Sequence, residues 1–437
     1  MTEVGAAPAL PLLQHRPFRM LSYTRFFSRV AQNALNFALV LLITEETGKA
    51  FYSSLLVLAL VVPSTVAGIV AGNAADALPK RLLVLAGDFA RAGVCLYFLQ
   101  QGSSVAVYYL IAVLLATATQ FAGAAESAIL PAIIDRPDLA RANALNQAVG
   151  GAAQLIGLGL LTPVMLRVFD SEDALFGVCA ALFLVAGVQA LFIGSTRSKI
   201  RVEVGGEATG SWWLSGWRAI RADRQVVHAS IGLTLIASTL IILGGLIPLY
   251  INDTLGLPVD LGALILTPAA VGVVLGLRVA GFLARRVPHA VLSSAGFVTF
   301  VICLALLAFV NQLADLLGGF GAFSWLNRVN FGSFDGGGLM AMIVVFPLGF
   351  SFALVSVAGQ TVIDDRVPLH LRGRVGATQG AMTAVLSSAP VLAAGAMSDL
   401  IGVTPVIALV AALIGVAAVA NFRSPKHEQP SRGRTVA

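Results

Sequence analysis

The stretch G72-N-A-A-D76-A-L-P-K80-R81 separates two long apolar segments, near 53–72 and 82–101. Its charges, glycine and proline mark a short polar connection, because charged groups belong in water and Pro interrupts helices. Each flanking segment has about the 20 apolar residues that a helix needs to cross a bilayer. The stretch therefore predicts a tight loop between two transmembrane helices.

The composition of the whole chain agrees with many such helices. Of the 437 residues, 57% are hydrophobic and only 11% are charged, and the mean hydropathy is +0.88. A soluble domain carries about 25% charged residues. Twelve spans would use roughly 240 residues, so a large soluble domain has no room. The 44 glycines and 18 prolines fit closely packed helices in lipid.

Breaks of charge, glycine and proline divide the apolar sequence into twelve predicted spans. The first six lie near 20–43, 53–72, 82–101, 105–129, 142–166 and 174–194. The second six lie near 226–251, 260–284, 290–311, 339–360, 375–396 and 401–421. An even number of spans places both termini on the same side of the membrane.

Lysines and arginines indicate which side that is, because cytosolic loops are enriched in them. Most lie before the first span, in the even-numbered loops or at the end of the chain, whereas the opposite loops hold Lys49, Arg167, Arg328 and many acids. Both termini are therefore predicted to be cytosolic, in a plasma (bacterial inner) membrane. The net charge of +6 follows from this topology and from contact with anionic membrane lipid, so no nucleic-acid partner is expected.

Two loops of the first half recur in the second half, as in transporters built from duplicated bundles. At one constant offset, Ala71, Gly72, Asp76, Pro79 and Leu83 lie over Ala280, Gly281, Arg285, Pro288 and Leu292. Asp135 and Arg136 after the fourth span likewise match Asp365 and Arg366 after the tenth. We predict an all-α integral membrane protein whose twelve transmembrane helices form two pseudo-symmetric six-helix bundles. The expected divisions are an N-terminal tail (1–19), a bundle (20–194), a linker (195–225), a second bundle (226–421) and a basic tail (422–437).

The spacing in residues 72–81 resembles the loop motif of the major facilitator superfamily, although Ala77 and Pro79 depart from it. The segments LPAIIDRPDLARANALNQ (130–147), VIDDRVPLHLRGRV (362–375) and R25-F-F-S-R29 resemble the macrolide-efflux and enterobactin-exporter branch, which contains drug:proton antiporters. The resemblance implies export of amphipathic or hydrophobic small molecules by proton-coupled alternating access, without a cofactor.

The loop motif also has a physical interpretation. A carboxylate at Asp76 can bind the N-terminus of a neighbouring helix and pair with basic groups, which would hold one conformation of the protein. We predict that Gly72, Asp76, Lys80 and Arg81 form a conformational switch. An ordinary solvated loop acid is the alternative for Asp76.

Two acids, Asp88 and Glu126, fall inside predicted spans, where ionisable groups are costly and are functional candidates. Arg91 follows Asp88 by three residues, a spacing that permits a pair on one helix face. For Asp88 and Arg91, a structural charge cluster is favoured over a role in proton relay. For Glu126, a proton site and a charge cluster stay equally open, because helix 4 offers no partner.

Polar residues also form a stripe on helix 1, with Arg25, Arg29, Gln32, Asn33 and Asn36 three or four residues apart. A stripe in lipid must face protein or water, so substrate-cavity lining is expected, with hydrogen bonding between helices as the alternative. Weaker cavity candidates are Gln120, Gln147, Gln154 and Gln379. Arg278 joins them as a lone arginine in helix 8, where the alternatives are pairing with an acid, binding of an anionic group and snorkelling to the cytosolic interface.

Two connections carry aromatic residues. Trp213, Trp217 and Ile220 share one face of a predicted interfacial helix in the linker, which acts as a tether. The segment 312–338 is predicted to lie on the outer membrane surface or to cap the exit.

The sequence argues against an enzyme. The Gly48-Lys49 pair lacks the remainder of a phosphate-binding loop, and the five histidines are scattered, so neither ATP hydrolysis nor a metal site is expected. Cys95, Cys179 and Cys303 are predicted to be small core residues. The expected partners are a small-molecule substrate, protons and membrane lipid, and the expected state is a monomer. A lipid or lysolipid translocator and a non-transporting membrane sensor or scaffold are the alternative functions.

Overall fold

The computed structural model describes residues 14–102, 104–134, 138–193, 212–258, 262–283, 286–318 and 336–422. Within these ranges the chain is mostly helical and contains no strand. Twelve of the described helices are long and apolar enough to cross a membrane. The predicted all-α membrane fold is therefore confirmed.

The first six membrane helices are α1 (Arg16–Thr47), α2 (Ala50–Ala77), α3 (Lys80–Gln101), α4 (Val105–Ile133), α5 (Leu139–Ile156) and α6 (Glu172–Ala190). Two π-helical segments, η3 (Gly157–Leu161) and η4 (Val164–Val168), continue α5. The last six are α8 (Arg224–Leu249, continued by η5, Tyr250–Thr254), α9 (Gly262–Leu283), α10 (His289–Ala308), α12 (Gly336–Arg366), α13 (Leu369–Ile401) and α14 (Val403–Phe422). The predicted twelfth span begins too early, because α13 continues to Ile401 and ends at Gly402, whose positive φ of 88° favours glycine.

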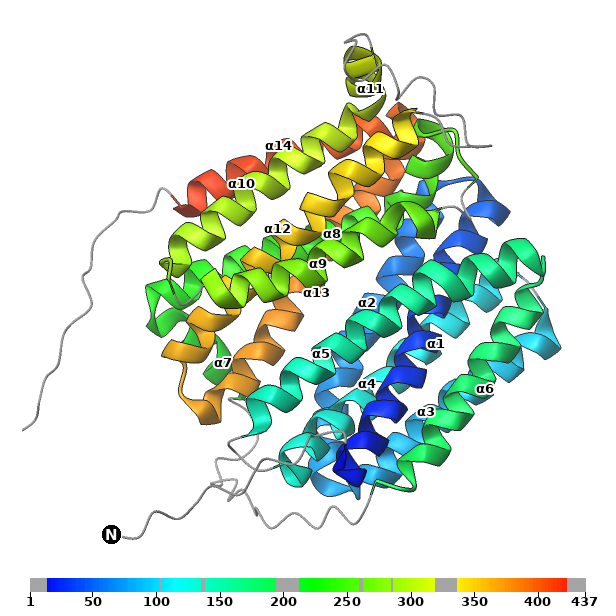
Figure 1. The fold of residues 1–437 in the computed structure, drawn as a ribbon, viewed down its shortest axis with the longest axis vertical. Helices are drawn as coiled ribbons and strands as arrows, with labels where there is room; N and C mark the ends of the chain where they lie inside the picture. The colour runs from blue at the N-terminus through cyan, green and yellow to red at the C-terminus, as the bar shows by residue number, and fades with distance from the viewer. Residues whose placement is uncertain are drawn as a thin grey trace, which may run out of the picture.

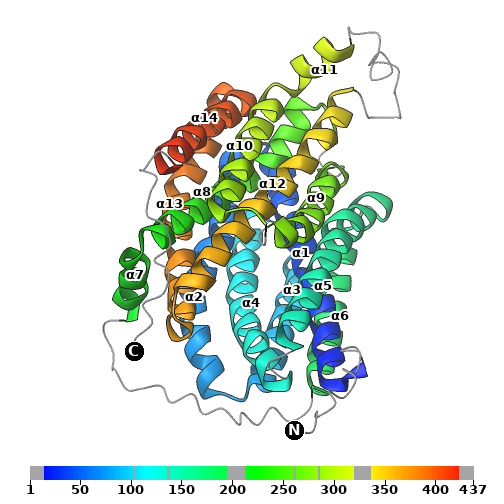
Figure 2. The ribbon, with the colours of Figure 1, turned by 60° about the vertical axis from the view of Figure 1, so that its left-hand side comes forward.

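The helices form two bundles that lie side by side (Figure 1 and Figure 2). We call the end where α1 begins and α14 ends the terminal end, and the opposite end the distal end. The bundles meet through α2, which packs against α8 and α13, and through α9, which packs against α5 and η3.

Each bundle has its own apolar core. In the first half, the Phe98 and Phe176 rings stack with their centroids 3.7 Å apart inside a cluster drawn from α1, α2, α3, α4 and α6. In the second half, Phe297 and Phe300 of α10 centre a cluster that also includes residues of α8, α12 and α14. The three cysteines are buried and free, Cys95 and Cys179 in the first core and Cys303 in the second. Their predicted place in the core is confirmed.

Glycines allow α9 and α12 to approach within backbone contact. A Cβ atom on Gly272 of α9 would lie 2.1 Å from the Phe346 carbonyl oxygen of α12, and one on Gly349 of α12 would lie 2.1 Å from the Ala269 carbonyl oxygen of α9. Neither site has space for a side chain. Small residues at such crossings let membrane helices pack by van der Waals contact, which is a main source of their association.

We therefore expect Gly349→Ala to lower the free energy of unfolding by about 1–3 kcal/mol, because the added methyl group overpacks the α9–α12 contact. Unfolding of the purified protein by sodium dodecyl sulfate in mixed micelles measures this change. The matched control is Gly244→Ala in α8, where a Cβ atom meets nothing within 4 Å. An equal loss in both variants would contradict the packing argument.

Two further helices extend the bundles. The predicted interfacial helix of the linker is α7 (Trp212–Ala222), and it packs against α13 of the second half. Ile220 is buried there beside Val226 and Val375, and the Arg221 guanidinium stacks on Trp217. The side chain of Trp213 lies outside the described residues. In the 312–338 connection, α11 (Val310–Gly318) stands at the distal end, and residues 319–335 lie outside the described part (Figure 1).

Candidate functional site

The loop motif at residues 72–81, from which the transmembrane helices were first predicted, lies at the terminal end, between α2 and α3. The predicted span ended at Gly72, but α2 continues to Ala77, so most of the motif is helical. Pro79 is the N-cap of α3, and Lys80 and Arg81 are its first residues. Proline suits this position because it has no amide hydrogen to leave unbonded at a helix start. The Asp76 side chain lies outside the described residues.

Glu126 of α4 has a partner from another helix. The Nε of Arg25 in α1 donates a hydrogen bond to Oε2 of Glu126 at 3.2 Å, and the two side chains are only 14% and 6% exposed. At about 1.5 Å per residue, the pair lies roughly 10–13 Å from the terminal ends of its helices. Sequence spacing within α4 did not reveal this partner, because it lies on α1.

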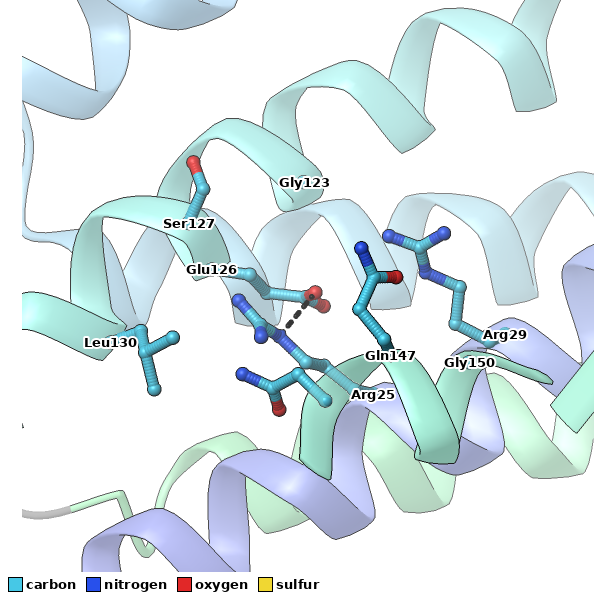
Figure 3. A pocket seen from close by; sticks show the side chains of 9 residues that line it. Arg25, Arg29, Gly123, Glu126, Ser127, Leu130, Gln147 and Gly150 are labelled. Atoms are coloured by element: carbon cyan, nitrogen blue, oxygen red, sulfur yellow. Dashed lines mark hydrogen bonds and ion pairs between the residues drawn. The ribbon is translucent and has the colours of Figure 1, made fainter. Parts of the chain in front are cut away.

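The pair borders a pocket of about 310 Å³ between α1, α4 and α5. Its lining residues are Arg25, Arg29, Gly123, Glu126, Ser127, Leu130, Asn146, Gln147 and Gly150. Figure 3 shows the Arg29 guanidinium and the Gln147 carboxamide extending beside the Arg25–Glu126 pair. Polar and charged side chains thus dominate this pocket, whereas small-molecule sites are usually lined mainly by apolar side chains with a few polar groups.

The pocket contains residues that the sequence argument did not select. Arg25 and Arg29 belong to the predicted stripe, but neither Ser127 nor Asn146 was selected. Both polar atoms of the Asn146 carboxamide are buried without a hydrogen-bond partner among the described residues. In the sequence, the position of Asn146 next to Gln147 is the signal that could have identified it as a pocket residue.

The part of the helix 1 stripe nearer the distal end forms a hydrogen bond to a neighbouring helix. Seven residues beyond the Arg25–Glu126 pair on both helices, Thr119 of α4 donates a hydrogen bond to Oε1 of Gln32 at 2.6 Å. Nε2 of Gln32 donates another to Asn36 at 2.7 Å. Gln32 is buried. Its role is therefore hydrogen bonding between helices, which was the alternative to cavity lining for this stripe. Asn33 lies against η3, where a Cβ atom on Gly157 would be 3.1 Å from the Asn33 Cβ.

Asp88 and Arg91 form the ion pair that their spacing predicted, within α3. Both side chains are buried, and the Arg91 guanidinium lies 4.7 Å from the centre of the Phe183 ring of α6. A Cβ atom on Gly187 of α6 would be 3.2 Å from the Asp88 Cβ. The pair therefore lies inside the α3–α6 contact, and neither residue lines the pocket.

The other cavity candidates lie outside the pocket lining. Gln154 and Arg278 are exposed, and Gln379 is half-buried. Gln120 faces α2, where a Cβ atom on Gly68 would lie 3.5 Å from its Oε1. Of the candidates outside α1, the structure brings Gln147 to the pocket.

The repeated Asp-Arg pair of the second half lies at the terminal end. Arg366 donates a hydrogen bond to Oδ2 of Asp223 at 2.8 Å, and Asp365 lies 3.9 Å from His289. Burial raises the pKa of Asp223, but the hydrogen bonds from Arg366 and the Gln225 amide and the charge of Arg366 outweigh burial and hold that pKa below its usual value. This contact fixes the start of α8 to the end of α12. Asp135 and Arg136, the counterparts in the first half, lie outside the described residues.

Comparisons with known proteins agree with this architecture. A family model described as Major Facilitator Superfamily matches residues 21–390. The nucleoside transporter NupG is similar in structure, with a TM-score of 0.71 at 12% identity over 94% of this chain and 100% of that one. An auto-inhibited POT family peptide transporter gives 0.72 at 12% identity over 96% and 99%. A bacterial homologue of the iron transporter ferroportin in the inward-facing state gives 0.64 at 15% identity over 94% and 100%. No curated protein matches the sequence.

Proposed function

The chain belongs to the major facilitator superfamily, and from this premise we propose that it exports amphipathic or hydrophobic small molecules by proton-coupled alternating access. The two halves rock about the pocket, which takes the polar part of the cargo from the cytosolic side. The loop similarity to the macrolide-efflux and enterobactin-exporter branch supports export as the direction. The excess of basic residues at the terminal end supports a cytosolic location for that end.

The single observation that carries the proposal is the shielded Arg25–Glu126 pair at the pocket wall. An ionisable carboxylate at membrane depth is costly, which makes Glu126 a candidate for a role in the transport cycle. The pair joins α1 to α4, so a change in the charge of Glu126 alters a contact between helices as well as the charge of the pocket. Glu126 is therefore the proposed proton carrier.

The proposed coupling of cargo movement to proton movement rests on one carboxylate, Glu126, which would bind either a proton or the cargo. Oε2 of Glu126 accepts the bond from Arg25, and its other oxygen is the proposed acceptor for a hydroxyl or amine group of the cargo. A protonated Glu126 carries no charge, which weakens its bond to Arg25 and to such a donor. Proton and cargo then exclude each other, which is the requirement for exchange. Asn146 and Gln147 of α5 supply further hydrogen-bonding groups to the pocket.

Flux measurements in proteoliposomes test the proposal. The purified protein is offered a panel of fluorescent amphipaths, including hydrophobic cations and macrolide-like compounds, with and without a pH gradient. We expect at least one compound to accumulate, against its own gradient, in the acidic compartment, because cargo enters that compartment in exchange for the protons that leave it. Flux that ignores the pH gradient would contradict proton coupling. Movement of a labelled phospholipid between leaflets, with none of the panel transported, would instead identify a lipid translocator.

A further inference from the structure

A carboxylate from one half caps a helix of the other half at the distal end. Asp399, near the end of α13, accepts hydrogen bonds from the backbone N–H groups of Ala50 at 2.7 Å and Phe51 at 3.1 Å. These are the first two residues of α2, and the first turn of an α-helix leaves its N–H groups without partners in the helix. Lys49, the N-cap of α2, makes no side-chain cap. Asp399 therefore supplies from the second half the cap that the sequence around α2 lacks.

The helices around this contact are packed tightly enough to hold it in place. Ser54, one turn further along α2, is fully buried between α8 and α13. A Cβ atom on Gly245 of α8 would lie 2.7 Å from the Ser54 hydroxyl oxygen, and one on Gly395 of α13 would lie 2.6 Å from it. Gly395 precedes Asp399 by about one helical turn, so the same close approach of α13 brings the carboxylate to the start of α2.

From this geometry we propose that the contact between Asp399 and the N-terminus of α2 acts as a latch. It holds the two halves together at the distal end. It joins the two halves without a covalent link, so it exists only while they are closed at this end. The carboxylate faces the positive end of the α2 dipole, which strengthens both hydrogen bonds. When the halves rock apart, both hydrogen bonds break, and Asp399, which is already exposed, and the two amides bond to water instead. The latch thus favours the state closed at the distal end, whatever the cargo.

The expected size of the effect follows from helix capping. Loss of a capping side chain or of a favourable charge at a helix terminus changes an equilibrium by about 5- to 30-fold. Asp399→Ala should therefore raise the population that is open at the distal end by about this factor. Asp399→Asn keeps the size and one acceptor oxygen but loses the charge, so its effect should be smaller.

Thiol labelling measures the open population on a relative scale. Ser54→Cys places a thiol at a buried position that opening of the distal end would expose, and all labelling rates are compared in this same background. Its reaction rate with a water-soluble maleimide follows the fraction of open molecules when opening and closing are fast. The three native cysteines are buried, and their reaction reports unfolding. In lipid nanodiscs, we expect Asp399→Ala to speed the labelling of Cys at position 54 by about 5- to 30-fold, with the native cysteines still unreactive.

The matched control is Asp315→Ala, which removes an exposed acid on α11 at the same end. An unchanged labelling rate in Asp399→Ala would overturn the latch, as would an equal acceleration in Asp315→Ala. Labelling of the native cysteines at the same rate would also overturn it, because the variant would then be unfolding. The measurement needs neither cargo nor a pH gradient, so it stands apart from the transport test.

Discussion

Replacement of Arg91 by leucine is expected to lower the free energy of unfolding by about 3–5 kcal/mol. Asp88 is fully buried, and Arg91 supplies the opposite charge within the same helix. Without the guanidinium, α3 must keep an unpaired carboxylate inside the α3–α6 contact or take up a proton there. The variant also loses the stacking of Arg91 on Phe183. Unfolding by sodium dodecyl sulfate in mixed micelles gives the free energy.

Two further variants separate the effect of breaking the Asp88–Arg91 ion pair from the effect of losing an arginine elsewhere. The double substitution Asp88→Leu with Arg91→Leu removes both charges, and we expect it to recover most of the loss, because apolar residues often replace a buried ion pair without cost. Arg218→Leu removes an exposed arginine of α7 and should change stability by less than about 0.5 kcal/mol. A loss below about 1 kcal/mol in Arg91→Leu, or a double variant as unstable as the single one, would contradict this account.

Glu126→Gln is expected to abolish the response of transport to a pH gradient. Each proton exchanged across a gradient of one pH unit is worth about 1.4 kcal/mol, which permits about tenfold accumulation of cargo. Glutamine keeps the shape of the side chain and can accept the bond from Arg25, but it does not titrate. Accumulation should therefore fall by about tenfold to the level without a gradient, while exchange of labelled for unlabelled cargo at equal pH continues. Both rates are measured in the same proteoliposomes.

The control for Glu126→Gln is another acid with a hydrogen bond of its own. Glu172, at the distal end of α6, accepts a bond from the Tyr108 hydroxyl at 3.0 Å and does not line the pocket. Glu172→Gln should leave the pH response intact. Persistence of gradient-driven accumulation in Glu126→Gln would remove this residue from the coupling. Loss of exchange at equal pH would show that the variant damages the pocket, and Glu126 would then belong to cargo binding.

Much of the architecture could be predicted because hydropathy and charge act locally. Runs of about 20 apolar residues give the helices, and the polar break at 72–81 gives one of the loops, whatever the rest of the chain does. Helix ends were less certain, since α2 continues beyond the predicted Gly72 to Ala77. A helix can extend past the apolar segment, because its backbone stays hydrogen-bonded in water as in lipid. Proline at position 79 marks where it must stop.

The candidate site was only partly predictable. The i, i+3 spacing was enough to pair Asp88 with Arg91, because both residues lie on one helix. The polar stripe on α1 was also visible in the sequence. The sequence did not show which of its residues line the pocket and which bond to other helices. Arg25 and Arg29 line the pocket, whereas Gln32 bonds to α4. Which side of a stripe meets water and which meets a helix depends on the neighbouring helices and on their rotation.

The sequence by itself determined the membrane fold, the number of spans, the internal repeat and the end that carries most basic residues. These properties rest on composition and on spacing within single helices. The tertiary structure decided which distant groups meet. Arg25 and Glu126 lie 101 residues apart, and Ala50 and Asp399 lie 349 apart. Such contacts depend on the order, tilt and depth of neighbouring helices, and helix packing sets these three quantities. The paired proton candidate and the distal latch therefore became visible only in the folded protein.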